Sequence, residues 1–173
     1  MADTELGGRI LKVNHAGEHG AVNIYFGQIL VARIFAPALT AELAVFREHE
    51  QKHRAIFWEE LQRRGRSRCR SYYICGIGGF VLGVISGILG RQAIAATTVA
   101  VENVVLGHLE HQLKTLDRVD EAAVNAIQRI VRDEREHRDT YAARLETGQF
   151  WPKLLTPIVA LSTESVIWLG MNL

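Results

Sequence analysis

The chain has few of the residues that interrupt helices or cross-link small extracellular domains. Only two cysteines and three prolines occur among its 173 residues. Cys69 and Cys75 have no Cys-x-x-Cys spacing, which argues against a disulfide framework and a cysteine-ligated zinc site and suits a reducing compartment. Because proline breaks helix interiors, three prolines leave long spans in which helices can continue.

A strong excess of charge is also missing. The formal net charge is +1, which argues against a nucleic-acid partner bound by bulk electrostatics. With 48% hydrophobic and 23% charged residues, the composition is that of a globular protein. The mean hydropathy of +0.04 is too low for a polytopic membrane protein. The first residues, "MADTELGG", contain no basic region followed by an apolar run, so we expect no signal peptide.

No stretch of alternating β-branched residues predicts a sheet, whereas apolar residues recur at helical spacing. The length suits a single domain over residues 1–173. Turns are predicted at Pro37 to Thr40 and in "LDRVD", and a basic connection in "RRGRSRCR". The predicted charged or amphipathic helices cover residues 9–35, 40–64, 91–116 and 121–146.

Two further segments carry almost no charge. Residues 71–90 have none, and residues 150–173 contain only Lys153 and Glu164. Each segment is long enough to span a bilayer. For residues 71–90 we favour a helix that lies on the membrane or packs against the bundle, because glycines recur there every three or four residues, from Gly76 to Gly90, and allow close helix approach. Exposed apolar area of this size predicts a dimer, a membrane contact or both.

Two Glu-x-x-His pairs supply a chemical motif. They are Glu50 with His53 and Glu134 with His137. Residues i and i+3 share one face of a helix, so the carboxylate and imidazole of each pair converge. Either pair alone is weak evidence for a metal site, since "RDEREHRDTY" at 132–141 also reads as a solvated helix face.

The spacing between the pairs strengthens the case. Glu50 and Glu134 are 84 residues apart, and so are Glu18 and Glu102. Glu18 and Glu102 each precede a Glu-x-x-His glutamate by 32 residues, with a predicted turn near the midpoint. Facing positions of an antiparallel helical hairpin are related in this way. Two such hairpins would direct four glutamates and two histidines inward at one level, which is the ligand set of ferritin-like di-iron proteins.

The same offset pairs the two uncharged segments, 71–89 with 155–173. The chain is therefore predicted to contain two copies of a three-helix unit, at about 1–89 and 90–173. The predicted fold class is all-α: a ferritin-like four-helix bundle built from two pseudo-repeated helical hairpins, each followed by an additional apolar helix.

Six residues are predicted metal ligands. Carboxylate oxygens with one imidazole per metal suit iron or manganese better than zinc or copper(I). A structural glutamate would explain Glu18 or Glu102 alone, and a solvated face would explain residues 132–139 but not the 84-residue register. The predicted ligands are Glu18, Glu50, His53, Glu102, Glu134 and His137.

At these motifs the sequence resembles the 5-demethoxyubiquinone hydroxylases, ferritin-like enzymes of ubiquinone biosynthesis. The resemblance covers residues 9–146 and, more loosely, the apolar tail. It implies the same six metal ligands and two iron ions per chain. It rests on "NHAGEHGAVNIYFGQ" at 14–28, the most specific block, and on "EHEQKHRAIF" at 48–57, "TTVAVENVVLGHLEHQL" at 97–113 and "RDEREHRD" at 132–139.

The resemblance further implies a membrane-associated monooxygenase. A reduced di-iron centre would use O₂ to hydroxylate the ring of a polyprenylated methoxybenzoquinone or its quinol, with the second oxygen atom leaving as water. The implied electron donor is NADH or a redox protein. The implied location is peripheral, on the cytoplasmic face of the cell membrane or, in a eukaryote, the inner mitochondrial membrane. A homodimer or a complex with other ubiquinone-biosynthesis proteins is expected, and no nucleic acid.

Four residues outside the ligand set are singled out. His108 matches a family histidine near the site. It is expected either to contact the metal ligands or take part in electron delivery, or to be only a partly exposed polar contact. Leu109 stands where the family pattern has an aromatic residue, usually tyrosine. We expect Asp133 to hydrogen-bond a ligand histidine of the opposing hairpin. Its partner at the 84-residue offset is His49, so the surroundings of the two irons are expected to differ.

Other di-iron functions remain open. One alternative is an iron-handling or oxidant-scavenging protein similar to ferritin or rubrerythrin. The apolar segments do not suit a soluble hollow shell, and the sequence lacks a rubredoxin-type cysteine module. Another is a hydroxylase of a soluble or nucleic-acid substrate, and the near-neutral charge speaks against RNA.

Overall fold

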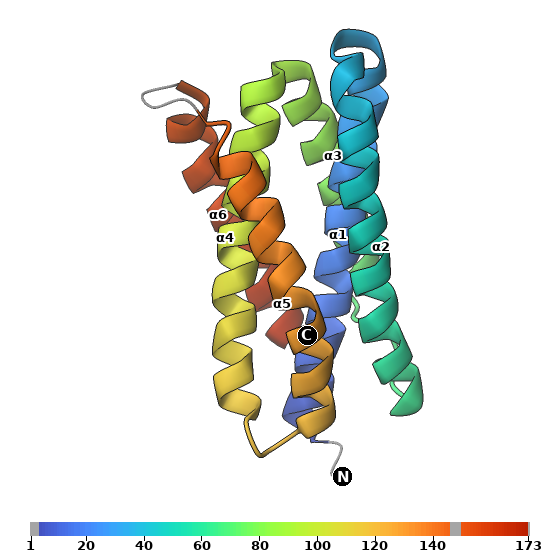
Figure 1. The fold of residues 1–173 in the computed structure, drawn as a ribbon. Coiled ribbons are helices and arrows are strands. Elements are labelled where there is room, and N and C mark those ends of the chain that lie inside the picture. The colour runs from blue at the N-terminus through green and yellow to red at the C-terminus, as the bar shows by residue number, and fades with distance from the viewer. Residues whose placement is uncertain (1–3, 146–149, 173) are drawn as a thin grey trace.

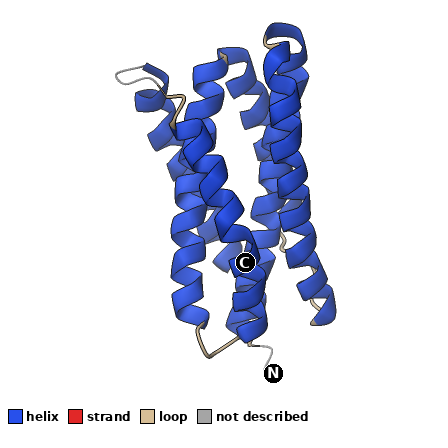
Figure 2. Cartoon of the chain, in the orientation of Figure 1, coloured by secondary structure: helices blue, strands red, loops and turns tan. Residues whose placement is uncertain are grey.

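The computed structural model describes residues 4–145 and 150–172, and every regular element in these two ranges is helical (Figure 2). The fold is all-α, as the sequence predicted, and is consistent with a ferritin-like fold. A short 3₁₀ helix, Pro37–Leu39, follows the first α-helix. The α-helices are α1 (Glu5–Phe35), α2 (Thr40–Arg63), α3 (Tyr72–Leu89), α4 (Arg91–Leu116), α5 (Glu121–Ala142) and α6 (Phe150–Asn172).

Two predicted helix ends differ from the structure. Helix α1 begins at Glu5 rather than at residue 9, because the Thr4 hydroxyl accepts a hydrogen bond from the Gly7 amide and caps the helix. Helix α5 ends at Ala142 rather than at residue 146, and the chain turns over residues 143–145. Residue 146 lies outside the described residues. Apolar periodicity marks the middle of a helix, whereas caps and turns decide its ends.

Figure 1 shows two antiparallel helical hairpins side by side, α1 with α2 and α4 with α5. The 3₁₀ turn at Pro37–Leu39 joins the first pair, and residues 117–120 join the second. Asp120 caps α5 by accepting a hydrogen bond from the Ala123 amide. Helix α2 packs against α5, and α1 contacts both α4 and α5. The turns therefore lie where the 32-residue spacing required them.

The two apolar helices pack against the first helix of each hairpin. Helix α3 lies along α1, and α6 lies along α4. A Cβ atom on Gly79 would collide with the carbonyl oxygen of Gly20, and one on Gly83 with that of Ile24. The glycine face of α3 thus allows its backbone to approach α1, as its spacing predicted.

Apolar side chains fill the bundle on both sides of the level occupied by the predicted ligands. One core cluster contains Leu11, Phe57 and Leu109. Another contains Tyr25 and Leu43 among others. On α1, α2 and α4 the predicted ligands lie in sequence between members of these two clusters. The carboxylates are therefore held at the middle of the bundle, between two apolar clusters.

Helices α3 and α6 are both long and apolar enough to cross a membrane, judged by length and composition. The apolar window of Tyr72–Leu89 is 39% buried within the protein, whereas that of Phe150–Asn172 is only 11% buried. Helix α3 packs against the bundle, as we favoured from the sequence. Helix α6 leaves large apolar side chains exposed, including Leu161 and Trp168.

Candidate metal centre

Four helices bring all six predicted ligands together at one level of the bundle. Each of the six residues is at most 5% exposed. Within α2 and α5 the Glu-x-x-His spacing places both side chains on the inward face. Helix α1 contributes Glu18, α2 contributes Glu50 and His53, α4 contributes Glu102, and α5 contributes Glu134 and His137.

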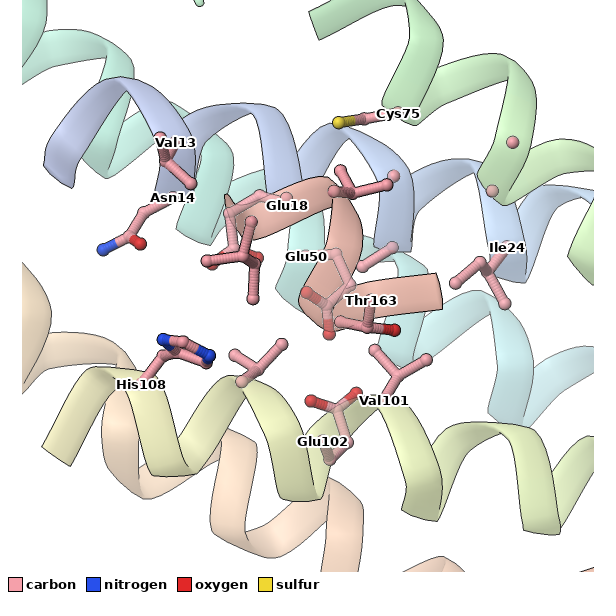
Figure 3. A pocket seen from close by; sticks show the side chains of 18 of the residues that line it. Val13, Asn14, Glu18, Ile24, Glu50, Cys75, Val101, Glu102, His108 and Thr163 are labelled. Carbon is pink, nitrogen blue, oxygen red and sulfur yellow. The ribbon is translucent and has the colours of Figure 1, made fainter. Parts of the chain in front are cut away.

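The six side chains form two overlapping groups, each of metal-site size. In one group, ligand atoms of Glu18, Glu50, His53 and Glu134 lie within 4.8 Å of one another. In the other, Glu50, Glu102, Glu134 and His137 meet the same limit. Glu50 and Glu134 belong to both groups, so each lies close enough to the other members to contribute to either one. Figure 3 shows the carboxylates of Glu50 and Glu102 pointing toward each other.

Unsatisfied polar atoms test whether this arrangement fits metal ions. The Nδ1 atom of His53 lies 2.8 Å from Oε1 of Glu134, and Nδ1 of His137 lies 3.0 Å from Oε1 of Glu50. These short distances lack hydrogen-bond geometry, and all four atoms are buried without a hydrogen-bond partner among the described residues. Buried atoms of this kind are costly unless satisfied. A pair of cations would satisfy them, so the donor set fits a dinuclear metal centre.

The electrostatics of the cluster point the same way. Burial, together with the neighbouring Glu134 and Glu50 carboxylates, holds the pKa of Glu18 and of Glu102 well above the usual value. Burial alone would lower the pKa of His137, but the Glu134 and Glu50 carboxylates raise it to about 9. The cluster therefore retains protons when no other cation is available, and divalent metals are suited to replace them.

Each ligand histidine contacts a different residue through its Nε2 atom, behind the ring as seen from the cluster. The Nε2 atom of His53 lies 3.2 Å from Oδ2 of Asp133. The Nε2 atom of His137 lies 3.0 Å from Nδ1 of His49. Both contacts cross between α2 and α5. Asp133 thus lies where the sequence prediction placed it, and His49 occupies the corresponding position behind the other histidine.

The other singled-out residues lie around this centre. His108 belongs to neither metal-sized group, and its Nε2 atom lies 2.9 Å from Oε2 of Glu164 in α6. Leu109 is buried in the apolar cluster with Phe57. His108 is therefore a partly exposed contact between α4 and α6 that also faces the cavity described next.

An apolar cavity of about 290 Å³ reaches the centre. Glu18, Glu50, Glu102 and Glu134 line it, and Figure 3 shows Val101 next to Glu102. Most of the remaining lining is aliphatic and comes from α1, α3, α4 and α6. The sequence predicted apolar helices over the segments that form α3 and α6 but did not assign them to a cavity. It did not single out the wall residues from α6, Ser162, Thr163, Val166 and Ile167, because no local motif marks them.

Comparison with known proteins places this site in a family. The family model described as ubiquinone biosynthesis protein COQ7 matches residues 5–170. The chain belongs to this family. Membership confirms the resemblance inferred from the four sequence blocks, and the match extends through α6, beyond the blocks themselves.

Two curated relatives cover nearly the whole chain. An NADPH-dependent 3-demethoxyubiquinone 3-hydroxylase, mitochondrial, from Dictyostelium discoideum is 34% identical over an alignment of 169 residues that covers 94% of this chain and 75% of the relative. A 3-demethoxyubiquinol 3-hydroxylase from Rhodospirillum rubrum is 32% identical over an alignment of 167 residues that covers 94% of this chain and 76% of the relative. Similar proteins thus occur in both eukaryotes and bacteria.

Proposed function

We propose that this protein is a di-iron monooxygenase of ubiquinone biosynthesis that hydroxylates the ring of a demethoxyubiquinone or its quinol. One observation carries the proposal: four buried glutamates, clustered with two buried histidines, line an apolar cavity in a chain of the COQ7 family. The names of the two relatives supply the substrate class and the reaction type.

The overall reaction replaces one ring C–H bond with C–OH. One oxygen atom of O₂ enters the ring and the other leaves as water, consuming two electrons and two protons. Bound iron supplies the activation of O₂. Among the protein groups, Glu50 and Glu134 would contribute to both metal positions, while Glu18 with His53 and Glu102 with His137 would complete one position each.

The cavity wall orients the substrate and keeps water out. Val101 lies next to Glu102, and Ile24 lines the same cavity, so a quinone ring at the carboxylates would be held there by apolar contacts (Figure 3). Side chains of α3 and α6 line the same cavity, among them Leu82 and Val166. A polyprenyl tail would follow this apolar wall between the two helices, because each buried CH₂ contributes about 0.8 kcal/mol.

We also propose that the exposed stripes of α3 and α6 contact a membrane. Ile77 and Ile88 of α3 are 68% and 65% exposed, and Leu161 and Trp168 of α6 are 70% and 67% exposed. A peripheral contact at these helices would let a membrane-dissolved quinone reach the cavity that they line. The surface would be the cytoplasmic face of the cell membrane, or the inner membrane in a mitochondrion. A homodimer or a complex with other ubiquinone-biosynthesis proteins would cover part of the same stripes.

The two halves of the chain are proposed to be structural repeats within one ferritin-like domain. Three features support this: α3 packs on α1 as α6 packs on α4, each hairpin supplies three ligands, and equivalent ligands are 84 residues apart. The repeats, at about 1–89 and 90–173, would pack as one four-helix bundle with two added apolar helices.

The electron donor is proposed to be a reduced nicotinamide nucleotide or a redox protein. One relative is named as NADPH-dependent, which supports the first. Purified protein that contains iron should therefore convert a demethoxyubiquinone analogue when NADH or NADPH is supplied, with isotopic oxygen from O₂ appearing in the product by mass spectrometry.

A single substitution tests the metal centre. Glu134→Ala removes a carboxylate shared by both metal groups, so bound iron should fall from two per chain and product should fall to background. Glu136→Ala, at an exposed position on the same helix, is the matched control and should retain both. Unchanged iron content in Glu134→Ala would contradict the metal centre.

A second experiment tests the substrate. A strain that lacks the gene should accumulate the demethoxy precursor and lose ubiquinone in lipid extracts. Normal ubiquinone would refute the hydroxylase assignment. If the purified protein oxidised iron but never formed the hydroxylated product, the iron-handling alternative would gain support instead.

A further inference from the structure

The two metal positions have matching ligands. Each combines the shared Glu50 and Glu134 with one further glutamate and one histidine. Glu18 and His53 complete the first position, whereas Glu102 and His137 complete the second. Because the ligand types match, the groups that hydrogen-bond the two histidines are a source of difference between the positions.

A carboxylate stands behind the first position. Nδ1 of His53 faces the cluster, so Nε2 carries the proton and donates it to Oδ2 of Asp133 at 3.2 Å. This hydrogen bond orients the ring and, because the acceptor is anionic, increases the donor strength of Nδ1. Arg132 lies 3.9 Å from Asp133, but its side chain is 93% exposed and water screens its charge.

A neutral imidazole stands behind the second position. Nδ1 of His137 faces the cluster, so its Nε2–H donates to Nδ1 of His49 at 3.0 Å. His49 must then be the neutral tautomer that carries its proton on Nε2. Its ring lies nearly parallel to that of His137, with an interplanar angle of 11° and centroids 5.3 Å apart, as an in-plane N–H···N hydrogen bond requires, and the Phe46 ring lies at its edge. The His49 ring is held in place but supplies no negative charge.

We infer that Asp133 and His49 are positioning residues that make the two metal positions unequal, with the His53 position binding its metal more tightly and filling first. A carboxylate acceptor strengthens His53 as a ligand more than an imidazole acceptor strengthens His137. This inference rests on the proposed di-iron function and extends it, since it assigns an order of metal binding to residues that are not themselves ligands.

Metal titration tests the inference without measuring catalysis. Fe²⁺ added under argon against a competing chelator should bind to the wild-type protein in two steps. Asp133→Ala should weaken the tighter step about 10–100-fold, the usual cost of losing such a partner. His49→Ala should weaken the looser step by less. Glu136→Ala, which removes an exposed carboxylate from the same helix as Asp133, should change neither.

A gain of affinity gives the sharpest outcome. His49→Asp places a carboxylate behind His137, so the looser step should strengthen and the two steps should converge. Mössbauer spectra of the iron-loaded wild type should show two distinct doublets. In His49→Asp the parameters of the two doublets should become more alike. Circular dichroism checks that each variant folds. If His49→Asp does not fold, His49→Gln is measured instead; it keeps a neutral acceptor oxygen, so its two binding steps should stay close to those of the wild type.

The outcomes distinguish a failure of the dinuclear centre from a failure of the inequality between its two positions. Wild-type protein that binds no iron would contradict the dinuclear centre itself. Two irons bound with equal affinity, or a tighter step that Asp133→Ala leaves unchanged, would overturn the inequality and leave the proposed function standing.

Discussion

At the scale of single residues, buried charges are satisfied in two ways. The ligand cluster leaves Glu134 and His53 atoms without hydrogen-bond partners among the described residues, which a metal would satisfy. Arg64 and Asp120 instead satisfy each other: two guanidinium nitrogens of Arg64 each donate to one Asp120 oxygen at 2.7 Å. The sequence predicted the first group from its spacing. It did not predict the second pair, because Arg64 and Asp120 are 56 residues apart and no repeat in the sequence relates their positions.

Removing the Asp120 carboxylate should destabilise the fold. Both side chains of the pair are at most 2% exposed, so Asp120→Ala leaves a buried guanidinium without this partner. The expected loss is about 3–5 kcal/mol in the free energy of unfolding, measured by chemical denaturation. Glu110→Ala breaks an exposed pair with Arg135 and should cost about 1 kcal/mol or less. Equal losses in the two variants would contradict the stabilising role of the buried pair.

The same pair predicts a pH dependence. Burial alone would raise the pKa of Asp120, but hydrogen bonds from Arg64, the Ala123 amide and Thr4 lower it to about 2. Because the folded pKa lies below the unfolded one, the contribution is present above about pH 4 and is lost as the pH falls toward 2. It amounts to about 2 kcal/mol, at about 1.4 kcal/mol per pKa unit. Between pH 5 and 2, wild-type stability should therefore fall by about this much more than that of Asp120→Asn, and parallel pH profiles would count against it.

At the scale of helices, periodicity predicted the elements and their faces, while close contacts decided how they dock. The glycine spacing of α3 indicated a face for close packing. That this face meets α1, and that Gly83 meets the Ile24 carbonyl, depends on the rotation of both helices about their axes. Helix ends were less predictable, as the Thr4 cap of α1 shows.

Substitution of one glycine should show this contact. A Cβ at Gly83 would collide with the backbone of Ile24, which cannot move aside cheaply. Gly83→Ala should therefore destabilise the protein by about 1–3 kcal/mol in thermal or chemical unfolding. Gly78→Ala on the same helix is the control, since no atom lies within 4 Å of its added Cβ. It should be neutral or stabilise by up to about 1 kcal/mol, and a Gly83→Ala variant as stable as this control would contradict the predicted packing.

At the scale of the whole molecule, the exposed apolar stripe of α6 links the cavity to its surroundings. Leu161 and Trp168 are seven residues apart, so they share one helix face, and both are about two-thirds exposed or more. Helix α6 also lines the cavity. A surface that contacts a bilayer would account for both features, because apolar area of this extent is costly in water.

Vesicle binding tests this surface. The double substitution Leu161→Glu with Trp168→Glu should weaken co-sedimentation with phospholipid vesicles on the order of 100-fold, since burying each side chain contributes about 1.5–3 kcal/mol. Val119→Glu changes an exposed apolar residue in the turn between α4 and α5 and should have little effect. Equal binding by the double variant and the wild type would contradict a membrane contact at α6, and a change in oligomeric state alone would indicate a protein partner.

The sequence by itself determined the all-helical class, the helix centres and the convergence of six side chains. Helical periodicity and the 32-residue hairpin spacing are properties of the chain that need no knowledge of side-chain packing. Only the tertiary structure decided that His49 stands behind His137, that His108 reaches Glu164 and that α6 closes one wall of the cavity. These contacts depend on how each helix is rotated about its axis and on the angles at which the helices cross. The packing of the whole core sets the rotations and the crossing angles.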